Sequence, residues 1–255
     1  MHHVSTNTNP FERHGIHALS VSSINLFAAE PALWVMEHLL KRKGRVSPSM
    51  HRGTACEAGI AYGLLHPDAD VEHCQSIALT EYDTLTALSG DPRRARERET
   101  IAPIVANGLS ELRNYGIPDE VQRRIEVNFD DIPVPFIGFI DFGWSAIGLT
   151  LDLKTQIKPP SEISAPHSRQ VALYTHKTNR EARVAYATPI KTVIYNLEDR
   201  ATHITAIINI ARRMEKFLAI SNDPYELAGL VVPNWESFYW TDPVTRALGR
   251  EVFGF

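Results

Sequence analysis

The feature that most constrains this fold is a pair of strand-like runs joined by a short turn. Residues 132–142 and 149–155 are rich in β-branched and aromatic side chains, which favour extended strands. Gly143, Gly148 and the polar residues between them supply turn chemistry. We therefore predict a β-hairpin with its tip at residues 146–147, a tight turn that strand geometry allows.

The predicted hairpin carries two carboxylates and one amine on one face. Its register places Asp141 opposite Asp152, with Cβ atoms about 5 Å apart. Asp152 and Lys154 are two residues apart on one strand and share a face, whereas Leu153 points into the core. Carboxylates this close repel unless a cation lies between them, and hard oxygen ligands favour Mg²⁺ or Mn²⁺. The Lys154 amine can neutralise a phosphate or a developing oxyanion.

Two predicted helices carry further candidate residues. Ser47 caps a helix that runs to about residue 65 and places Glu57 on an otherwise small, apolar face, where Gly53 permits close packing. Alone, a helical Glu is usually a solvated surface residue. A second predicted helix, 161–177, presents Gln170 and Tyr174 one turn apart. Without the other motifs, the simplest interpretation of that pair is a tyrosine that faces the core beside a glutamine with a structural role.

In this order the motifs resemble those of the PD-(D/E)XK nuclease superfamily, within it the RecB-like and phage-exonuclease branch. The family has an Asp at the end of one strand, then Asp or Glu-x-Lys on the next, matched by Asp141 and by Asp152-Leu153-Lys154. Ile140 stands where the family often has Pro. The branch adds Gln-x-x-x-Tyr, matched by Gln170 and Tyr174, and an upstream helix with a Gly and an acidic or His residue, matched by Gly53 and Glu57. The resemblance spans roughly residues 20 to 195.

The resemblance implies an α/β (α+β) fold with a restriction-endonuclease-like core. That core is a central mixed β-sheet flanked by helices, with helical additions at both ends. It implies metal ligands for Mg²⁺ or Mn²⁺ and a catalytic set; they are Asp141, Asp152, the Leu153 carbonyl, Glu57 and Lys154. It further implies residues that bind DNA or support the active site, namely Gln170, Tyr174, Arg169 and Arg52.

The implied activity is that of a Mg²⁺-dependent DNA exonuclease that hydrolyses phosphodiester bonds in phage or bacterial recombination, replication or repair. DNA is the expected substrate, and a single-strand annealing or replication protein is a candidate partner. Two alternatives stay open: a structure-specific or restriction-type endonuclease, and a catalytically silent relative that binds DNA or a protein. Intact Asp141, Asp152 and Lys154 favour an enzyme, because a silent relative has no use for buried, repelling carboxylates.

Other chemistries lack their residues. Some RecB-like relatives hold an iron–sulfur cluster through one early Cys-Pro and three late cysteines. Here Glu30-Pro31 stands at the early position and no Cys follows Cys74, so we expect no cluster. The chain has no Gly-x4-Gly-Lys-Ser/Thr phosphate loop and no His-Glu-x-x-His, which disfavours a coupled helicase and a zinc hydrolase.

Composition places broad limits on the protein. With 255 residues and 44% hydrophobic content, the chain can bury a sizeable core, and we expect a loose segment over 1–19 followed by a single domain over 20–255. The net charge of −4 argues against indiscriminate adhesion to DNA, so any DNA binding must use a local basic groove on the protein. Cys56 and Cys74 fit a reducing cytoplasm. No apolar run reaches the ~20 residues of a membrane span.

Four clusters have a structural and a functional interpretation. His2, His3, His14 and His17 could bind a metal, and His14-x-x-His17 has feasible spacing, but further ligands at structural spacing are missing. The basic run 41–43 suits a helix C-terminus or a phosphate. The arginines of 93–98 alternate with glutamates, as on a self-paired helix, with DNA contact as the alternative. The aromatic residues of 235–240 either anchor the C-terminal segment or stack bases.

Overall fold

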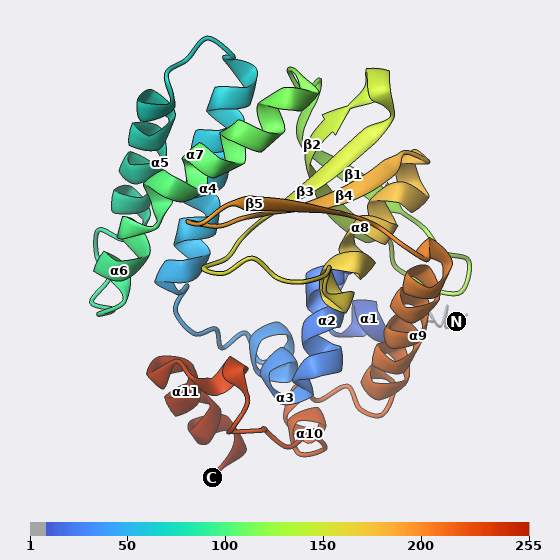
Figure 1. Ribbon diagram of the computed structural model, residues 1–255. Coiled ribbons are helices and arrows are strands. Elements are labelled where there is room, and N and C mark those ends of the chain that lie inside the picture. Colours follow the sequence, from blue (N-terminus) through green and yellow to red (C-terminus); the bar gives the residue numbers. More distant parts are fainter. Residues whose placement is uncertain (1–8, 255) are drawn as a thin grey trace, which may run out of the picture. The chain divides into compact units, whose positions relative to one another are not determined.

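The computed structural model describes residues 9–254 (Figure 1). Within them the strands form one five-stranded sheet in the order β1-β2-β3-β4-β5. The strands are β1 Glu120–Val127, β2 Phe136–Trp144, β3 Leu149–Thr155, β4 Glu181–Ala187 and β5 Thr192–Asn196. β2 and β3 run antiparallel, β3 and β4 parallel, and β4 and β5 antiparallel, so the sheet is mixed. The predicted α+β class is confirmed.

Helices make up most of the remaining chain. They are α1 Pro10–Arg13, α2 Val21–Ala29, α3 Pro31–Trp34, α4 Pro48–Leu65, α5 Val71–Leu85, α6 Arg94–Glu99, α7 Ile101–Leu112, α8 Ala165–Thr178, α9 Arg200–Leu218, α10 Pro224–Ala228 and α11 Pro243–Phe253. Single turns of 3₁₀-helix are η2 Arg113–Tyr115, η3 Ser145–Ile147 and η4 Phe238–Trp240, and η1 Val35–Leu39 is a π-helix. None of these described helices combines the length and apolarity needed to cross a bilayer.

Contacts divide the chain into two compact units. Unit 1 comprises residues 1–45, 126–138 and 201–255, and unit 2 comprises 46–125 and 139–200. Helices α4 to α8 and strands β3 to β5 lie wholly in unit 2. The single domain expected over 20–255 stays a prediction.

The hairpin has the predicted turn. Trp144 pairs with Leu149, and η3 between them holds the predicted tip. Gly148 closes the turn at φ 64°, a left-handed conformation that glycine adopts without strain. Phe142 pairs with Leu151, and extending this register by one residue brings Asp141 opposite Asp152.

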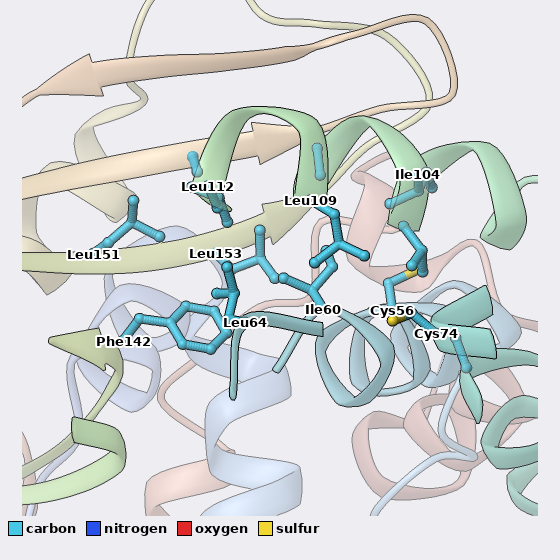
Figure 2. Packing of buried hydrophobic residues seen from close by; sticks show 14 of the residues in the cluster. Cys56, Ile60, Leu64, Cys74, Ile104, Leu109, Leu112, Phe142, Leu151 and Leu153 are labelled. Carbon is cyan, nitrogen blue, oxygen red and sulfur yellow. The ribbon is translucent and has the colours of Figure 1, made fainter. Parts of the chain in front are cut away.

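The core of unit 2 lies between helices α4 and α7 and one face of the sheet. Leu151 and Leu153 of β3 and Phe142 of β2 point to that side (Figure 2). They meet Ile60 of α4 and Leu109 of α7, both almost fully buried. Because β3 presents every second side chain here, its residues 150, 152 and 154 face the opposite side of the sheet.

Glycines on α4 matter where the neighbouring helices approach. A Cβ at Gly59 would lie 2.6 Å from the carbonyl oxygen of Cys74, and one at Gly63 would lie 2.7 Å from Leu109. At Gly53 an added Cβ would make only an ordinary contact, 3.6 Å from Thr155. The close approach that we expected at Gly53 therefore occurs 6 and 10 residues later, at Gly59 against α5 and at Gly63 against α7.

Residues 9–19 are more ordered than a loose segment. Asn9 caps α1 through its side chain, and Phe11 is fully buried. Nε2 of His14 lies 3.2 Å from the carbonyl oxygen of Leu218 and 2.9 Å from that of Ser221, at the end of α9. His14 is therefore engaged with backbone carbonyls. His2 and His3 lie outside the described residues.

Two other segments of unit 1 refine the predictions. The basic run 41–43, which we expected at a helix C-terminus or on a phosphate, lies just after the end of η1 at Leu39, and Lys41 has φ 58°. The C-terminal aromatic residues serve mainly as an anchor. Trp240 is fully buried in a cluster with Met36, and Trp235 packs edge-on against Trp240, whereas Phe238 is 83% exposed.

Candidate functional site

The hairpin brings two carboxylates together in a buried position within unit 2. Asp152 is fully buried, and Asp141 is 9% exposed. Asp141 Oδ2 accepts the N–H of Leu153 at 2.7 Å, which fixes its side chain across the strand pair. Asp152 Oδ2 lies 2.8 Å from Lys154 Nζ, but no donor reaches it with hydrogen-bond geometry. A buried carboxylate oxygen left in this state is costly and favours an additional cation.

Glu57 joins this pair through a residue that the sequence did not point to. The side-chain amide of Gln122 on β1 donates to Glu57 and, at 2.9 Å, to Asp141 Oδ1. Gln122 has a backbone φ of 50°, a conformation that residues other than glycine rarely adopt. Strained residues of this kind cluster at functional sites. Glu57 thus reaches the hairpin, as predicted, but by an amide bridge.

The electrostatics of the site indicate an excess of negative charge. Burial raises the pKa of Asp141 well above its usual value, and repulsion by Asp152 and Glu57 adds to the rise. Burial also raises the pKa of Glu57. For Lys154, burial alone would lower the pKa, but the three carboxylates together outweigh it and raise the pKa, so the ammonium stays protonated.

Gln170 and Tyr174 support the site from helix α8. The Tyr174 hydroxyl donates to the carbonyl oxygen of Phe139 at 2.5 Å and lies 3.4 Å from Asp152 Oδ1. Gln170 Nε2 donates to the same hydroxyl at 2.7 Å. Tyr174 is 1% exposed, and burial raises its pKa well above the usual value, so its proton is retained. This geometry favours active-site support over direct DNA contact for Tyr174.

Arg52 occupies a buried supporting position. It pairs with Glu97 of α6, and its Nη2 donates to the carbonyl oxygen of Thr155 at 3.2 Å. The contact holds α4 against the residue that follows Lys154 on β3. Arg169 is half-buried on α8, and burial lowers its pKa.

His167 and Tyr186 form a second pair missed by sequence reasoning. Tyr186 on β4 lies directly beside Lys154 in the parallel register and is 1% exposed. Its hydroxyl lies 2.8 Å from Nδ1 of His167 on α8. Burial, followed by the charge of Lys154, lowers the pKa of His167 to about 4. Helical spacing was the available sign, because His167 precedes Gln170 by three residues and shares its face.

The arginines near α6 are paired locally, but with aspartates outside the run instead of with the glutamates that alternate with them. Arg93 binds Asp91 at 2.6 Å, and Arg98 binds Asp83 at 2.7 Å. Arg94 donates to Thr86 at 2.8 Å. These contacts are within the cluster and its neighbouring helix, which favours the structural interpretation over DNA contact.

The carboxylates offer hard oxygen donors but do not form a closed metal cage. Among residues 9–254, no three His, Cys, Asp or Glu side chains converge as a metal-binding group. Asp141 and Asp152 nonetheless fit Mg²⁺ or Mn²⁺, which take few protein carboxylates and retain waters. Asp152 Oδ2 accepts no hydrogen bond and is paired with the Lys154 ammonium at 2.8 Å, so this oxygen could also ligate a cation. A cation bridging Asp141 and Glu57 would have to displace the Gln122 amide.

Comparisons with known proteins leave the family open. No family model matches the chain, and no curated protein is similar enough to match. A solved structure described as "Crystal structure of SSO0001" aligns with 76% of this chain and 86% of its own, at 17% sequence identity and a TM-score of 0.33. A likeness at that level carries no argument. The resemblance to PD-(D/E)XK nucleases stays a prediction from the motifs.

Proposed function

We propose that this chain is a metal-dependent deoxyribonuclease, most similar to phage-type exonucleases. The single observation that carries the proposal is the meeting of Asp141 and Asp152, both buried, with Lys154 bonded at the same site. Holding two carboxylates together costs free energy unless a cation compensates them. The pattern matches the motif by which PD-(D/E)XK nucleases hold metal and phosphate.

Each group in the site has a distinct part in phosphodiester hydrolysis. Asp141, Asp152, the Leu153 carbonyl and Glu57 are the proposed ligands. With a divalent ion bound to these residues, the site would have a more acidic water and a positive charge beside the attacking and leaving oxygens. Lys154, kept charged by its neighbours, stabilises the additional negative charge on the phosphate, because phosphoryl transfer depends on positioning and electrostatics. Gln170 and Tyr174 fix the backbone of β2 beside the carboxylates.

One observation favours a second candidate, a catalytically silent DNA-binding relative. The Gln122 amide bridges Glu57 and Asp141 and so satisfies part of the negative charge without a metal. A silent relative would keep this bridge when Mg²⁺ is added, whereas an enzyme would exchange it for the ion.

The test is cleavage of end-labelled linear DNA and of covalently closed circular DNA, each with Mg²⁺ and with EDTA. We expect Mg²⁺-dependent digestion of linear DNA and slow attack on closed circles. Asp152→Asn should lower the rate at least about 10³-fold, the upper range for losing one preorganised electrostatic group. Asp68→Asn, an exposed acidic position in unit 2, is the matched control. Equal activity in EDTA would sink the proposal, and circles cut as fast as linear DNA would indicate an endonuclease.

A further inference from the structure

His167 and Tyr186 lie beside the proposed site but have no part in the reaction described above. Tyr186 is the β4 neighbour of Lys154, and its side chain lies on the same sheet face as Asp152 and Lys154. His167 approaches from the first turn of α8, and its ring contacts the Tyr186 ring with centroids 5.5 Å apart. Both residues belong to unit 2.

The hydrogen bonds determine which imidazole nitrogen carries the proton. The backbone N–H of Ser164 points to the Tyr186 hydroxyl oxygen at 3.4 Å, so that oxygen acts as an acceptor. Its own proton then needs an acceptor, and His167 Nδ1 at 2.8 Å is the one within reach among the described residues. Burial raises the pKa of Tyr186, which keeps this proton on the hydroxyl. An Nδ1 that accepts leaves the neutral ring protonated at Nε2.

This Nε2–H has no protein partner within residues 9–254, although the His167 side chain is half-buried. An imidazole N–H that no protein group accepts is available to a ligand. Tyr186, which holds the imidazole at 2.8 Å, is the β4 neighbour of Lys154, so His167 and Lys154 lie on the same side of the sheet, where an extended anion such as a strand with successive phosphates can meet both. In a DNA-cleaving site, that anion is the sugar–phosphate backbone.

We propose that His167 is a substrate-positioning residue that donates a hydrogen bond from Nε2 to a phosphate oxygen of the bound DNA strand, with its tautomer set by Tyr186. The inference rests on the proposed function. With a pKa of about 4, the ring is neutral at pH 7, so the contact adds direction without adding charge. A neutral donor avoids competing with the metal and Lys154 for the scissile phosphate and suits a neighbouring phosphate.

The experiment compares three variants on short end-labelled linear DNA with Mg²⁺. His167→Phe keeps an aromatic ring against Tyr186 and removes the donor, and it should raise KM about tenfold to a hundredfold with kcat little changed, since hydrogen bonds to charged groups are strong. His167→Gln restores an N–H donor near the Nε2 position and should recover most of that loss. Tyr186→Phe frees the tautomer and should cause a smaller rise in KM.

Two controls separate positioning from folding. His176→Phe, an exposed histidine on the same helix, should leave KM unchanged, and thermal unfolding should show that His167→Phe stays folded. The slope of log KM against log salt should also stay unchanged in His167→Phe, because a lost charged contact would alter it by about 0.7–0.9.

The outcomes distinguish this inference from the proposed function. Wild-type protein that neither binds nor cleaves DNA overturns the proposed function and this inference with it. An active wild type with an unaffected His167→Phe variant overturns the inference alone. So does a fall in kcat at constant KM, a changed salt slope, or a Gln variant no better than Phe.

Discussion

The two faces of strand β3 are equally buried but opposite in chemistry. Leu151 and Asp152 are adjacent in sequence and neither is exposed at all. Leu151 packs into the core with Phe142, where removal of apolar surface from water stabilises the fold at roughly 25 cal/mol per Å². Asp152 faces the other side, where burial costs free energy and one oxygen has no hydrogen bond. Burial by itself therefore does not identify a core residue. What identifies it is whether burial of the side chain stabilises or destabilises the fold.

The largest expected effect is loss of activity from the charged face. Lys154→Ala should lower the cleavage rate about 10²–10³-fold, the usual result of losing one preorganised group, with little change in Mg²⁺ affinity. Lys154→Arg should recover little, because a planar guanidinium does not replace a point charge. Single-turnover digestion in saturating Mg²⁺ measures this effect. A near wild-type rate for Lys154→Ala would remove the functional meaning of this face.

The apolar face should respond in stability instead of activity. Leu151→Ala should lower the free energy of unfolding by about 2–5 kcal/mol, from lost burial and a new cavity. Ile147→Ala, in the hairpin turn and 59% exposed, is the matched control and should stay within about 0.5 kcal/mol. Urea unfolding measures both. A loss of activity per folded molecule in Leu151→Ala, at unchanged stability, would contradict the division between the faces.

The third prediction is that the charged face of β3, unlike the apolar face, makes the free energy of unfolding depend on pH. Because the pKa of Asp141 is raised in the folded state, the folded protein binds more protons than the unfolded chain between the two pKa values. In EDTA, the contribution of Asp141 is therefore fully present below about pH 3.8 and is lost as the pH rises through the folded pKa. One pKa unit corresponds to about 1.4 kcal/mol.

The measurement is the difference in unfolding free energy between Asp141→Asn and wild type across pH. Asp141→Asn should gain stability relative to wild type as the pH rises, and Mg²⁺ should reduce that gain. Leu151→Ala should keep the wild-type pH profile because it removes no titratable group. If the difference in unfolding free energy between Asp141→Asn and wild type did not change with pH, the pKa of Asp141 would not be raised in the folded protein.

The smallest effect should come from the Gln122 bridge. Gln122→Ala removes the amide between Glu57 and Asp141, so the carboxylates repel and stability in EDTA should fall by about 1 kcal/mol, the usual worth of one or two hydrogen bonds. Relief of the backbone strain is small because Ala also disfavours positive φ. Thermal unfolding should show a larger Mg²⁺-induced rise in Tm for the variant than for wild type. An equal rise would indicate that Mg²⁺ does not displace the amide.

Local sequence was sufficient to predict the hairpin and the start of α4. β-branched runs, two glycines and strand alternation specify where Asp141, Asp152 and Leu153 lie, and Ser47 caps α4 by accepting the N–H of Met50, as the Ser-Pro pair predicts. These features depend on neighbouring residues. The chemical role of the site remains a prediction, because geometry alone does not test it.

What the sequence did not reveal depends on distant contacts. Gln122 bonds to a residue 65 positions away and adopts a backbone conformation that no local pattern requires. The Tyr186 position beside Lys154 follows from the parallel register of β3 and β4, which the helix between them leaves undetermined in sequence. The π-helix η1 at 35–39, after which the basic run follows outside the helix, is a rare form that the local sequence did not indicate.

The discontinuity of unit 1 has a consequence for the order of synthesis. His14 contacts the carbonyl oxygen of Leu218, and Glu30 accepts the N–H of Asn234, each across 204 residues. Unit 2 ends at residue 200, so every residue of the candidate site has left the peptidyl-transferase centre before these partners are translated. The N-terminal helices must therefore wait for the last fifth of the chain, whereas Asp141 and Asp152 of the candidate site have their hydrogen-bond and ion-pair partners within unit 2.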